Sequence, residues 1–223
     1  MGYHQTLSRV EMYFDKTATK TWERLTSDAP VSRIRQTVRA GRDEMRAKLL
    51  AQVPSDLRGA RILDAGCGPG QLTQALAERG ADVVAIDISP SLIDIARKRI
   101  PTTLHSQIDF RVGDMCDPAL GGFDHVIAMD SMIYYARDDL ARVLTSLSAR
   151  TWGKINFTVA PKTPLLMAMW YAGKLAPKGD KSPTMIPQSF SGLSRAIEGQ
   201  ATLFDLGRVT SGFYISHAMG CQK

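Results

Sequence analysis

The sequence predicts an α/β protein with a doubly wound, mostly parallel sheet of seven strands. From residue 60 onward, short apolar runs alternate with amphipathic runs of helical length, a pattern typical of consecutive βαβ units. The first apolar run leads into ILDAGCGPG (62–70), a glycine-rich turn of the kind that joins a strand to a helix beside a ligand. Two strand-like segments after residue 200 are expected to close the sheet.

The expected elements follow one another in a regular order. Ser89 and Pro90 suit the N-cap and the first position of the helix that follows the second strand. Other amphipathic helices are expected over 72–80 and 139–150. The expected strands are ARILDAG (60–66), DVVAIDI (82–88), IDFRVGD (108–114), FDHVIAMD (123–130), KINFTVA (154–160), TLFDLGRV (202–209) and SGFYISHAM (211–219).

The first 55 residues are expected to form a helical arm that closes over the site, ahead of a main domain over 56–223. Within this arm, apolar residues of the segment 31–53 recur at near-helical spacing, and arginines occupy most of the remaining positions. The pattern predicts a basic amphipathic helix with a solvated basic face over a buried stripe. The stripe consists of Val31, Ile34, Val38, Met45 and Leu49.

The alternation stops after Ala160, and residues 161–190 form a predicted insertion. Within it, LLMAMWYAGKLAPKG (165–179) carries no charged residue for nine positions. A bilayer span takes about 20 apolar residues, so this segment is too short to cross a membrane. We therefore expect it to lie on a surface or over a site.

Composition limits the class of protein. A hydrophobic fraction of 44% and a charged fraction of 22% are ordinary for a globular chain, and they favour neither disorder nor membrane integration. The net charge of +6 suits an anionic ligand, an anionic lipid or a nucleic acid without choosing among them. Cys67, Cys116 and Cys221 form no C-x-x-C pair, so a reducing, cytoplasmic compartment is expected.

Three carboxylates fall at the ends of three successive predicted strands, beside the glycine turn. Asp64 is a poor neighbour for a pyrophosphate and a good one for an ammonium group. Asp87 suits the two hydroxyls of a ribose, and Asp114 suits an adenine amino group. Together they describe S-adenosylmethionine. The predicted cofactor site comprises Asp64, Gly66, Gly68, Gly70, Asp87, Ile88, Asp114, Met115, Met129 and Ser131.

An NAD-dependent dehydrogenase is the alternative for this part of the chain. It would use Asp87 for the ribose but would leave Asp64 and Asp114 without partners. The G-x-G-x-G spacing is also one residue shorter than the dinucleotide pattern. Both observations favour S-adenosylmethionine over NAD as the cofactor.

Several segments carry a resemblance to known families. The glycine turn and its carboxylates resemble the class I S-adenosylmethionine-dependent methyltransferases over residues 60–160. The segments VEMYFDKTATKTWERL, AMDSMIYYA, FTVAPKTPLL and GFYISHAM resemble the magnesium-protoporphyrin IX O-methyltransferases of bacteriochlorophyll and chlorophyll biosynthesis, nearly over the whole chain. In relatives from oxygenic phototrophs a histidine commonly stands at the position of Tyr134, so a histidine-based role does not carry over.

The resemblance implies methyl transfer to the 13-propionate of Mg-protoporphyrin IX. It implies Tyr13 and Tyr134 as catalytic residues that orient the carboxylate, with the arm and the insertion 161–190 covering the substrate. No protein-held metal is expected, because His105, His125 and His217 lack metal-ligand spacing. Residues expected to bind the porphyrin and its second propionate are Phe14, Arg35, Arg39, Tyr135, Arg137, Lys162, Met167 and Trp170.

Alternatives and partners stay open at this point. Another small-molecule O- or C-methyltransferase, such as one acting on a quinone precursor, and a non-catalytic binder of porphyrin and S-adenosylmethionine are the competing functions. A magnesium chelatase subunit is a candidate donor of the substrate, and the flanking lysines of the insertion suit peripheral contact with the inner, photosynthetic membrane. Nucleic acid is not expected, since no N-P-P-Y tetrapeptide and no basic and aromatic interleaving occur.

Overall fold

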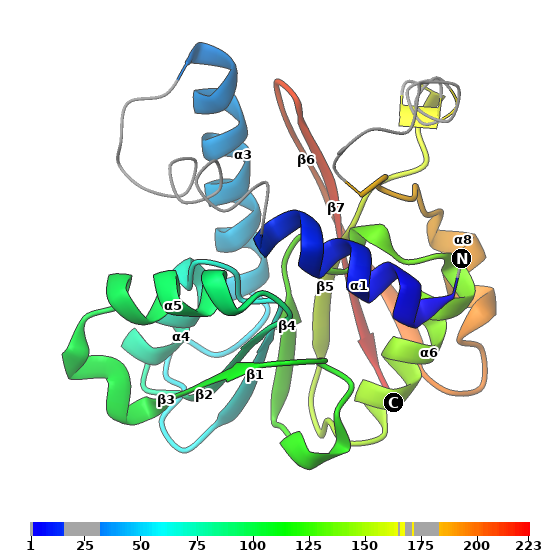
Figure 1. The fold of residues 1–223 in the computed structure, drawn as a ribbon. Coiled ribbons are helices and arrows are strands. Elements are labelled where there is room, and N and C mark those ends of the chain that lie inside the picture. The colour runs from blue at the N-terminus through cyan, green and yellow to red at the C-terminus, as the bar shows by residue number, and fades with distance from the viewer. Residues whose placement is uncertain (1, 16–31, 165, 168–170, 172–182) are drawn as a thin grey trace.

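A seven-stranded sheet forms the centre of the structure, a computed structural model that describes residues 2–15, 32–164, 166–167, 171 and 183–223 (Figure 1). The strand order is β3-β2-β1-β4-β5-β7-β6. The strands are β1 (Arg61–Ala65), β2 (Asp82–Asp87), β3 (Ile108–Val112), β4 (His125–Ala128), β5 (Ile155–Val159), β6 (Thr202–Ser211) and β7 (Tyr214–Gln222).

The pairing confirms the predicted sheet. Strands β1 to β5 pair with one another in parallel, whereas β7 is antiparallel to both β5 and β6. The chain winds outward from β1 to β3 in one direction and then returns to place β4 on the other side of β1. Ligands of open α/β sheets bind outside the carboxyl ends of the strands at such a switch point. The site is therefore expected beside the ends of β1 and β4.

Helices cover both faces of the sheet. Helices α3 (Arg33–Leu50), α4 (Gln71–Glu78) and α5 (Pro90–Arg99) pack on one face, and α6 (Arg137–Ser148) and α8 (Phe190–Ala196) pack on the other. Alternate residues of a strand point to opposite faces, so Ile62 belongs to the first core and Leu63 to the second. Short 3-10 turns complete the connections: η2 (Thr102–Gln107), η3 (Pro118–Leu120) and η4 (Met132–Tyr134).

Helix α3 is the predicted basic amphipathic helix. Ser32 caps it by accepting a hydrogen bond from the Arg35 backbone N–H. Of the predicted stripe, Met45 and Leu49 are fully buried and Val38 is half-buried, whereas Val31 lies outside the described residues. The prediction was wrong for Ile34, which is 57% exposed, because the first turns of the helix extend beyond the core. Its middle packs against the hairpin of β6 and β7, where a Cβ added at Gly41 would lie 2.7 Å from the Tyr214 ring. This close approach joins the arm to the far end of the sheet.

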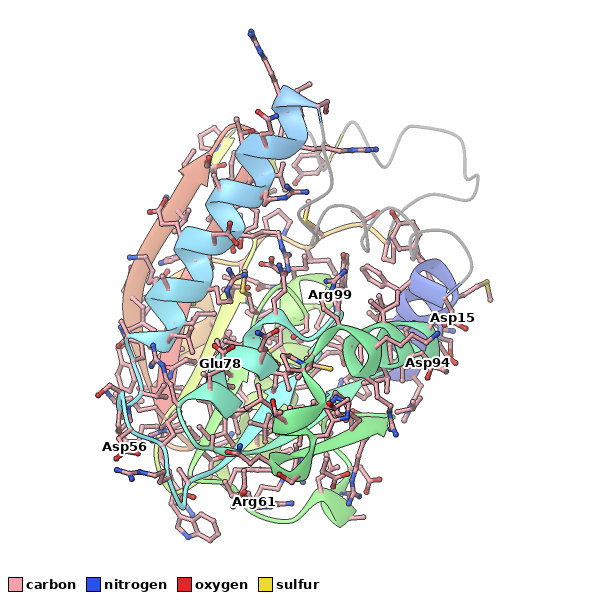
Figure 2. The ribbon with its side chains drawn as sticks, turned by 90° about the vertical axis from the view of Figure 1, so that its left-hand side faces the viewer. Asp15, Asp56, Arg61, Glu78, Asp94 and Arg99 are labelled. Carbon is pink, nitrogen blue, oxygen red and sulfur yellow. The ribbon has the colours of Figure 1, made fainter. Side chains whose placement is uncertain are left out.

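Helix α1 (Tyr3–Tyr13) lies across the carboxyl edge of the sheet (Figure 1). The Tyr3 hydroxyl donates to Asp114 at 2.6 Å at one end of the helix. Just beyond the other end, Asp15 accepts hydrogen bonds from the Ser89 hydroxyl and the Ser91 backbone N–H, where α1 meets α5 (Figure 2). Contacts at both ends hold α1 on the main domain.

Of the predicted insertion 161–190, the structure describes residues 161–164, 166–167, 171 and 183–190. Pro161 and Gln188 form a parallel bridge, and the Lys162 N–H donates to the Gln188 carbonyl at 2.9 Å, so the two ends of the insertion meet beside β5. Met167 is half-buried, and Trp170 lies outside the described residues. None of the helices in the described part of the chain is long and apolar enough to cross a membrane.

Candidate active site

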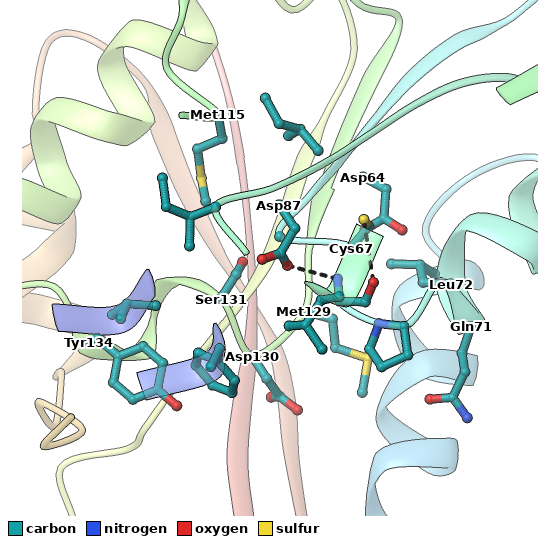
Figure 3. A pocket seen from close by; sticks show the side chains of 18 of the residues that line it. Asp64, Cys67, Gln71, Leu72, Asp87, Met115, Met129, Asp130, Ser131 and Tyr134 are labelled. Atoms are coloured by element: carbon teal, nitrogen blue, oxygen red, sulfur yellow. Dashed lines mark hydrogen bonds between the residues drawn. The ribbon is translucent and has the colours of Figure 1, made fainter. Parts of the chain in front are cut away.

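A cavity with an empty volume of about 950 Å³, part of it open to solvent, lies at the carboxyl ends of β1, β2 and β4 (Figure 3). Its wall combines the glycine turn after β1, the residues after β2 and β4, and side chains from α1 and α3. The cavity is thus where the strand order predicts a ligand.

The glycine turn forms one wall of the cavity. Gly66 and Gly68 line it with φ angles of 82° and 52°, a left-handed conformation that glycine adopts without steric cost. Nothing lies within 4 Å of a Cβ placed at Gly68, so the backbone there leaves open space for a ligand. Gly70, also predicted to bind the cofactor, does not line the cavity. It packs against Ala96 of α5 instead.

Two buried carboxylates face this turn. Asp64 lies one residue before the end of β1 and accepts a hydrogen bond from the Thr73 hydroxyl at 2.6 Å, and its burial raises its pKa to about 7. Asp87 ends β2 and accepts from the backbone N–H groups of Gly68 and Ser89, both at 2.9 Å, while burial raises its pKa as well. Among the described residues, neither carboxylate forms an ion pair. A positively charged ligand would supply the missing countercharge.

Asp114 is placed differently from the prediction. Its Oδ1 accepts from the Tyr3 hydroxyl at 2.6 Å and from the Cys116 backbone N–H at 2.8 Å, and the residue is not part of the cavity wall. Met115 does line the cavity. The Tyr3 ring stacks on Tyr135 with 5.2 Å between ring centroids. Tyr3 was not predicted, because no local pattern shows that the arm reaches the end of β3.

The remaining predicted cofactor residues all line the cavity: Ile88, Met129 and Ser131. The Ser131 hydroxyl donates to the Ala65 carbonyl at 2.6 Å, which fixes the loop after β4 against the glycine turn. This contact explains the absence of a side chain at Gly66, where a Cβ would lie 2.3 Å from the Cβ of Ser131.

Aromatic residues form the side of the cavity next to α1. Phe14, Tyr134 and Tyr135 line the cavity, as predicted. Tyr13 does not line it, and its ring packs against the Phe14 ring with 5.2 Å between the ring centroids. Burial, followed by the charges of Asp130 and Tyr13, raises the pKa of Tyr134. The Tyr134 phenol therefore stays protonated at neutral pH and acts as a hydrogen-bond donor.

The predicted cations are not the ones that reach the cavity. Arg35 and Arg39 do not line it, Lys162 is exposed, and Arg137 pairs with Asp138 beside a separate depression between α6 and α8. Two other arginines of α3 line the cavity instead: Arg42 and Arg46.

Helix geometry explains the shift along α3. Positions 35, 39, 42 and 46 share one helical face, because a helix repeats every 3.6 residues. At about 1.5 Å per residue, Arg35 lies roughly 10 Å further along the axis than Arg42. The repeated spacing of these arginines was the available signal, and only the packing of α3 on β6 and β7 selects the pair near the cavity.

Asp130, also missed from the sequence, is the centre of a polar cluster at the end of β4. Its φ is 56°, the only positive value among the non-glycine residues described. Its carboxylate pairs with Arg42 and accepts from the hydroxyls of Tyr214 at 3.0 Å and Thr158 at 3.1 Å. In Figure 3, Asp130 and Tyr134 lie on the side of the cavity opposite Asp64.

Comparisons with known proteins agree with this geometry. The family described as magnesium-protoporphyrin IX methyltransferase C-terminus matches residues 128–223, and a general methyltransferase domain matches residues 62–151. The magnesium-protoporphyrin O-methyltransferase of Rhodobacter capsulatus is 56% identical over 97% of this chain and 96% of its own length. A ubiquinone biosynthesis O-methyltransferase of Xanthomonas euvesicatoria is 36% identical over 56% of this chain and 55% of its own.

A solved structure agrees over the whole fold. The crystal structure of magnesium protoporphyrin IX methyltransferase from Synechocystis PCC 6803 with bound SAH superposes with a TM-score of 0.80. It is 25% identical in sequence and covers 97% of this chain and 99% of that one. With near-complete coverage at 56% identity to the Rhodobacter protein, the chain belongs to the magnesium-protoporphyrin O-methyltransferase family.

Proposed function

We propose that this protein transfers a methyl group from S-adenosylmethionine to the 13-propionate carboxylate of Mg-protoporphyrin IX, giving the monomethyl ester. The observation that carries the proposal is the 56% identity to the Rhodobacter enzyme over 97% of the chain. The quinone-type alternative is less well supported, because the ubiquinone enzyme matches only 56% of the chain.

The cavity suits the cofactor through its two buried carboxylates. When bound, S-adenosylmethionine supplies a methyl group on a positively charged sulfur, together with an ammonium group, a ribose and an adenine. Asp64 would hold the ammonium group, and Asp87 would accept both ribose hydroxyls. The open backbone at Gly68 leaves room for the amino-acid end, while Ile88 and Met115, which line the cavity, would pack on the adenine.

Arg46 is the candidate cation for the cofactor carboxylate. It lines the cavity, and its pairing partner Asp43, at 2.7 Å, has a side chain that is 49% exposed. An exposed ion pair of this kind contributes little to stability, so Arg46 can leave Asp43 and bind a ligand carboxylate at a small cost in free energy. Arg42, by contrast, pairs with the buried Asp130 at the end of β4, on the side of Tyr134.

Cofactor affinity is expected to depend on pH through Asp64. Its pKa of about 7 means that the carboxylate gains its charge as the pH rises through neutrality. Because the charged form attracts an ammonium group, affinity should rise about tenfold between about pH 6 and about pH 7.5. Calorimetric titration with S-adenosylmethionine measures this slope. Asp64→Asn should bind more weakly with a flat profile, and an unchanged slope in that variant would exclude Asp64 as the titrating group.

The methyl-transfer slot, which we place in the part of the cavity beside Tyr134, needs no general base. A propionate resembles a Glu side chain, whose pKa is about 4.3, so the nucleophile is already an anion at neutral pH. The chain then has to orient the carboxylate in line with the methyl group and exclude water, and proximity can contribute up to roughly 7 to 11 kcal/mol. Tyr134 and, after a small shift of α1, Tyr13 would orient the carboxylate. Phe14 and Tyr135 would exclude water.

The covering elements and partners are part of the same proposal. Residues 1–55 would act as an arm over the cofactor, and the insertion 161–190 would cover the porphyrin with Met167 and Trp170. The basic and apolar composition of that insertion suits peripheral contact with the inner membrane, in a protein that is otherwise cytoplasmic. A magnesium chelatase subunit is the expected source of a substrate so poorly soluble in water.

A visible-absorption titration tests the function directly. Purified protein is titrated with Mg-protoporphyrin IX, S-adenosylmethionine is added, and the pigment is analysed by mass spectrometry. The expected result is a shifted porphyrin spectrum followed by the gain of one methyl group. Binding without methylation would favour a non-catalytic carrier, and methylation of a quinone precursor but not of the porphyrin would favour the alternative enzyme.

A further inference from the structure

The cluster around Asp130 lies where β4 ends, next to the aromatic wall of the cavity. The Asp130 side chain is 9% exposed, and its backbone adopts a left-handed conformation that is unfavourable for a residue with a Cβ. Thr158 holds it twice, since its hydroxyl accepts from the Asp130 N–H at 2.7 Å and donates to the carboxylate at 3.1 Å. Tyr214 adds a hydroxyl at 3.0 Å from the same carboxylate. A carboxylate held in this way is rigid.

The partner that this rigid carboxylate orients is Arg42. The Arg42 side chain is 13% exposed, lines the cavity and reaches Asp130 from α3, the helix that also packs on Tyr214. A guanidinium group has five N–H donors in a planar fork, more than one carboxylate can accept. Arg42 pairs with Asp130 through Nη1, and its Nε is a buried atom with no hydrogen-bond partner among the described residues, so the Nε–H can donate to a second carboxylate that enters the cavity while the pair with Asp130 is kept.

Arg42 is also close to the proposed methyl-transfer slot beside Tyr134. Tyr134 lines the same cavity, and the charges of Asp130 and Arg42 both act on its hydroxyl. The two buried carboxylates of the cofactor site, Asp64 and Asp87, lie on the other side of the cavity (Figure 3). An anion that approaches the slot therefore enters a cavity whose wall carries Arg42, the less exposed of the two arginines that line it.

We infer that Arg42 binds the substrate carboxylate that becomes methylated, and that Asp130 is the positioning residue that aims its guanidinium. The inference rests on the proposed function. In the reaction, a carboxylate oxygen forms a bond to the methyl carbon, the carbon–sulfur bond breaks with its electron pair left on sulfur, and no proton moves. Asp130 already offsets much of the charge on Arg42, so the bound carboxylate keeps its electron density.

This arrangement also favours product release. The substrate carries an anion that pairs with Arg42, whereas the ester product is neutral at the same position. A charge-assisted hydrogen bond is worth about twice a neutral one, so esterification removes the strongest contact at the slot. Substrate and monomethyl ester should therefore differ in affinity, and Arg42 should be the reason.

The experiment compares the affinities of Mg-protoporphyrin IX and its monomethyl ester by absorption titration. The wild-type protein should prefer the diacid by about 10- to 100-fold, the range expected for hydrogen bonds to a charged group. Arg42→Met should abolish the preference. The same substitution at the exposed Arg33, on the same helix, should retain it. Because Arg42 belongs to a buried pair, Arg42→Lys is a second variant that keeps the charge, and it should retain only part of the preference.

Asp130→Asn tests the positioning role. Asparagine tolerates the left-handed conformation, so the backbone is kept while the charge is removed. We expect kcat to fall about tenfold or more through misplacement of the carboxylate, with the preference for the diacid retained. A kcat within twofold of wild type would overturn the role of Asp130.

The possible failures are distinguishable. Cofactor affinity, measured by calorimetry, reports whether each variant is folded. If folded Arg42→Met still prefers the diacid over the ester, the role of Arg42 is overturned while the proposed function stands. If the wild-type protein neither binds nor methylates the porphyrin, the proposed function falls, and this inference falls with it.

Discussion

Replacing Asp87 with alanine should weaken S-adenosylmethionine binding by about 100- to 1,000-fold. Each hydrogen bond from a ribose hydroxyl to a buried carboxylate is worth about 1.5 to 3 kcal/mol, and every 1.4 kcal/mol is a factor of ten in affinity. Asp87 also accepts the N–H groups of Gly68 and Ser89, so its loss loosens the turn that faces the cofactor. Calorimetric titration of the purified variant measures the effect.

The controls separate cofactor binding from folding. Asp87→Asn keeps an acceptor for the turn and should weaken binding less than alanine does. Asp109→Ala removes a carboxylate from the neighbouring strand β3, where the side chain is 47% exposed and pairs with Arg111, and it should change neither ligand's affinity. Porphyrin affinity should stay within about threefold in all three variants. A loss of porphyrin affinity with cofactor affinity unchanged would overturn the assignment of Asp87 to the ribose.

Gly66→Ala should lower the free energy of unfolding by about 2 to 4 kcal/mol. A left-handed backbone costs a residue with a Cβ roughly 1 to 2 kcal/mol, and overpacking adds typically 1 to 3 kcal/mol. The new methyl group would lie 2.3 Å from the Cβ of Ser131. Ser131 has little freedom to move, because its hydroxyl bonds to the Ala65 carbonyl at 2.6 Å. Equilibrium unfolding in urea measures the change.

Gly59→Ala is the matched control for Gly66→Ala. Gly59 has a similar φ of 77°, but nothing lies within 4 Å of a Cβ placed there. Only the backbone cost of about 1 to 2 kcal/mol should remain. Equal losses in the two variants would show that contact with Ser131 contributes nothing, and that the conformation alone demands glycine at position 66.

The sequence by itself determined the sheet and half of the site. Strands, helices and the glycine turn depend on neighbours within a few residues, so their periodicity and turn chemistry are visible in the chain. Asp64 and Asp87 were predictable for the same reason, because each lies at or next to the end of a recognisable strand and the ends of parallel strands meet at one edge. The family resemblance placed Phe14, Tyr134 and Tyr135 beside them, and all three line the cavity.

Only the tertiary structure decided which cations and which polar partners reach that edge. The Tyr3–Asp114 contact joins residues 111 positions apart, and the Tyr214–Asp130 contact joins residues 84 apart. No local sequence pattern shows that residues so far apart along the chain are in contact. Arg42 and Arg46 share a helical face with Arg35 and Arg39, so the sequence shows four equivalent arginines. The packing of α3 on the β6–β7 hairpin sets its position along the cavity, and that position selects the two that line it.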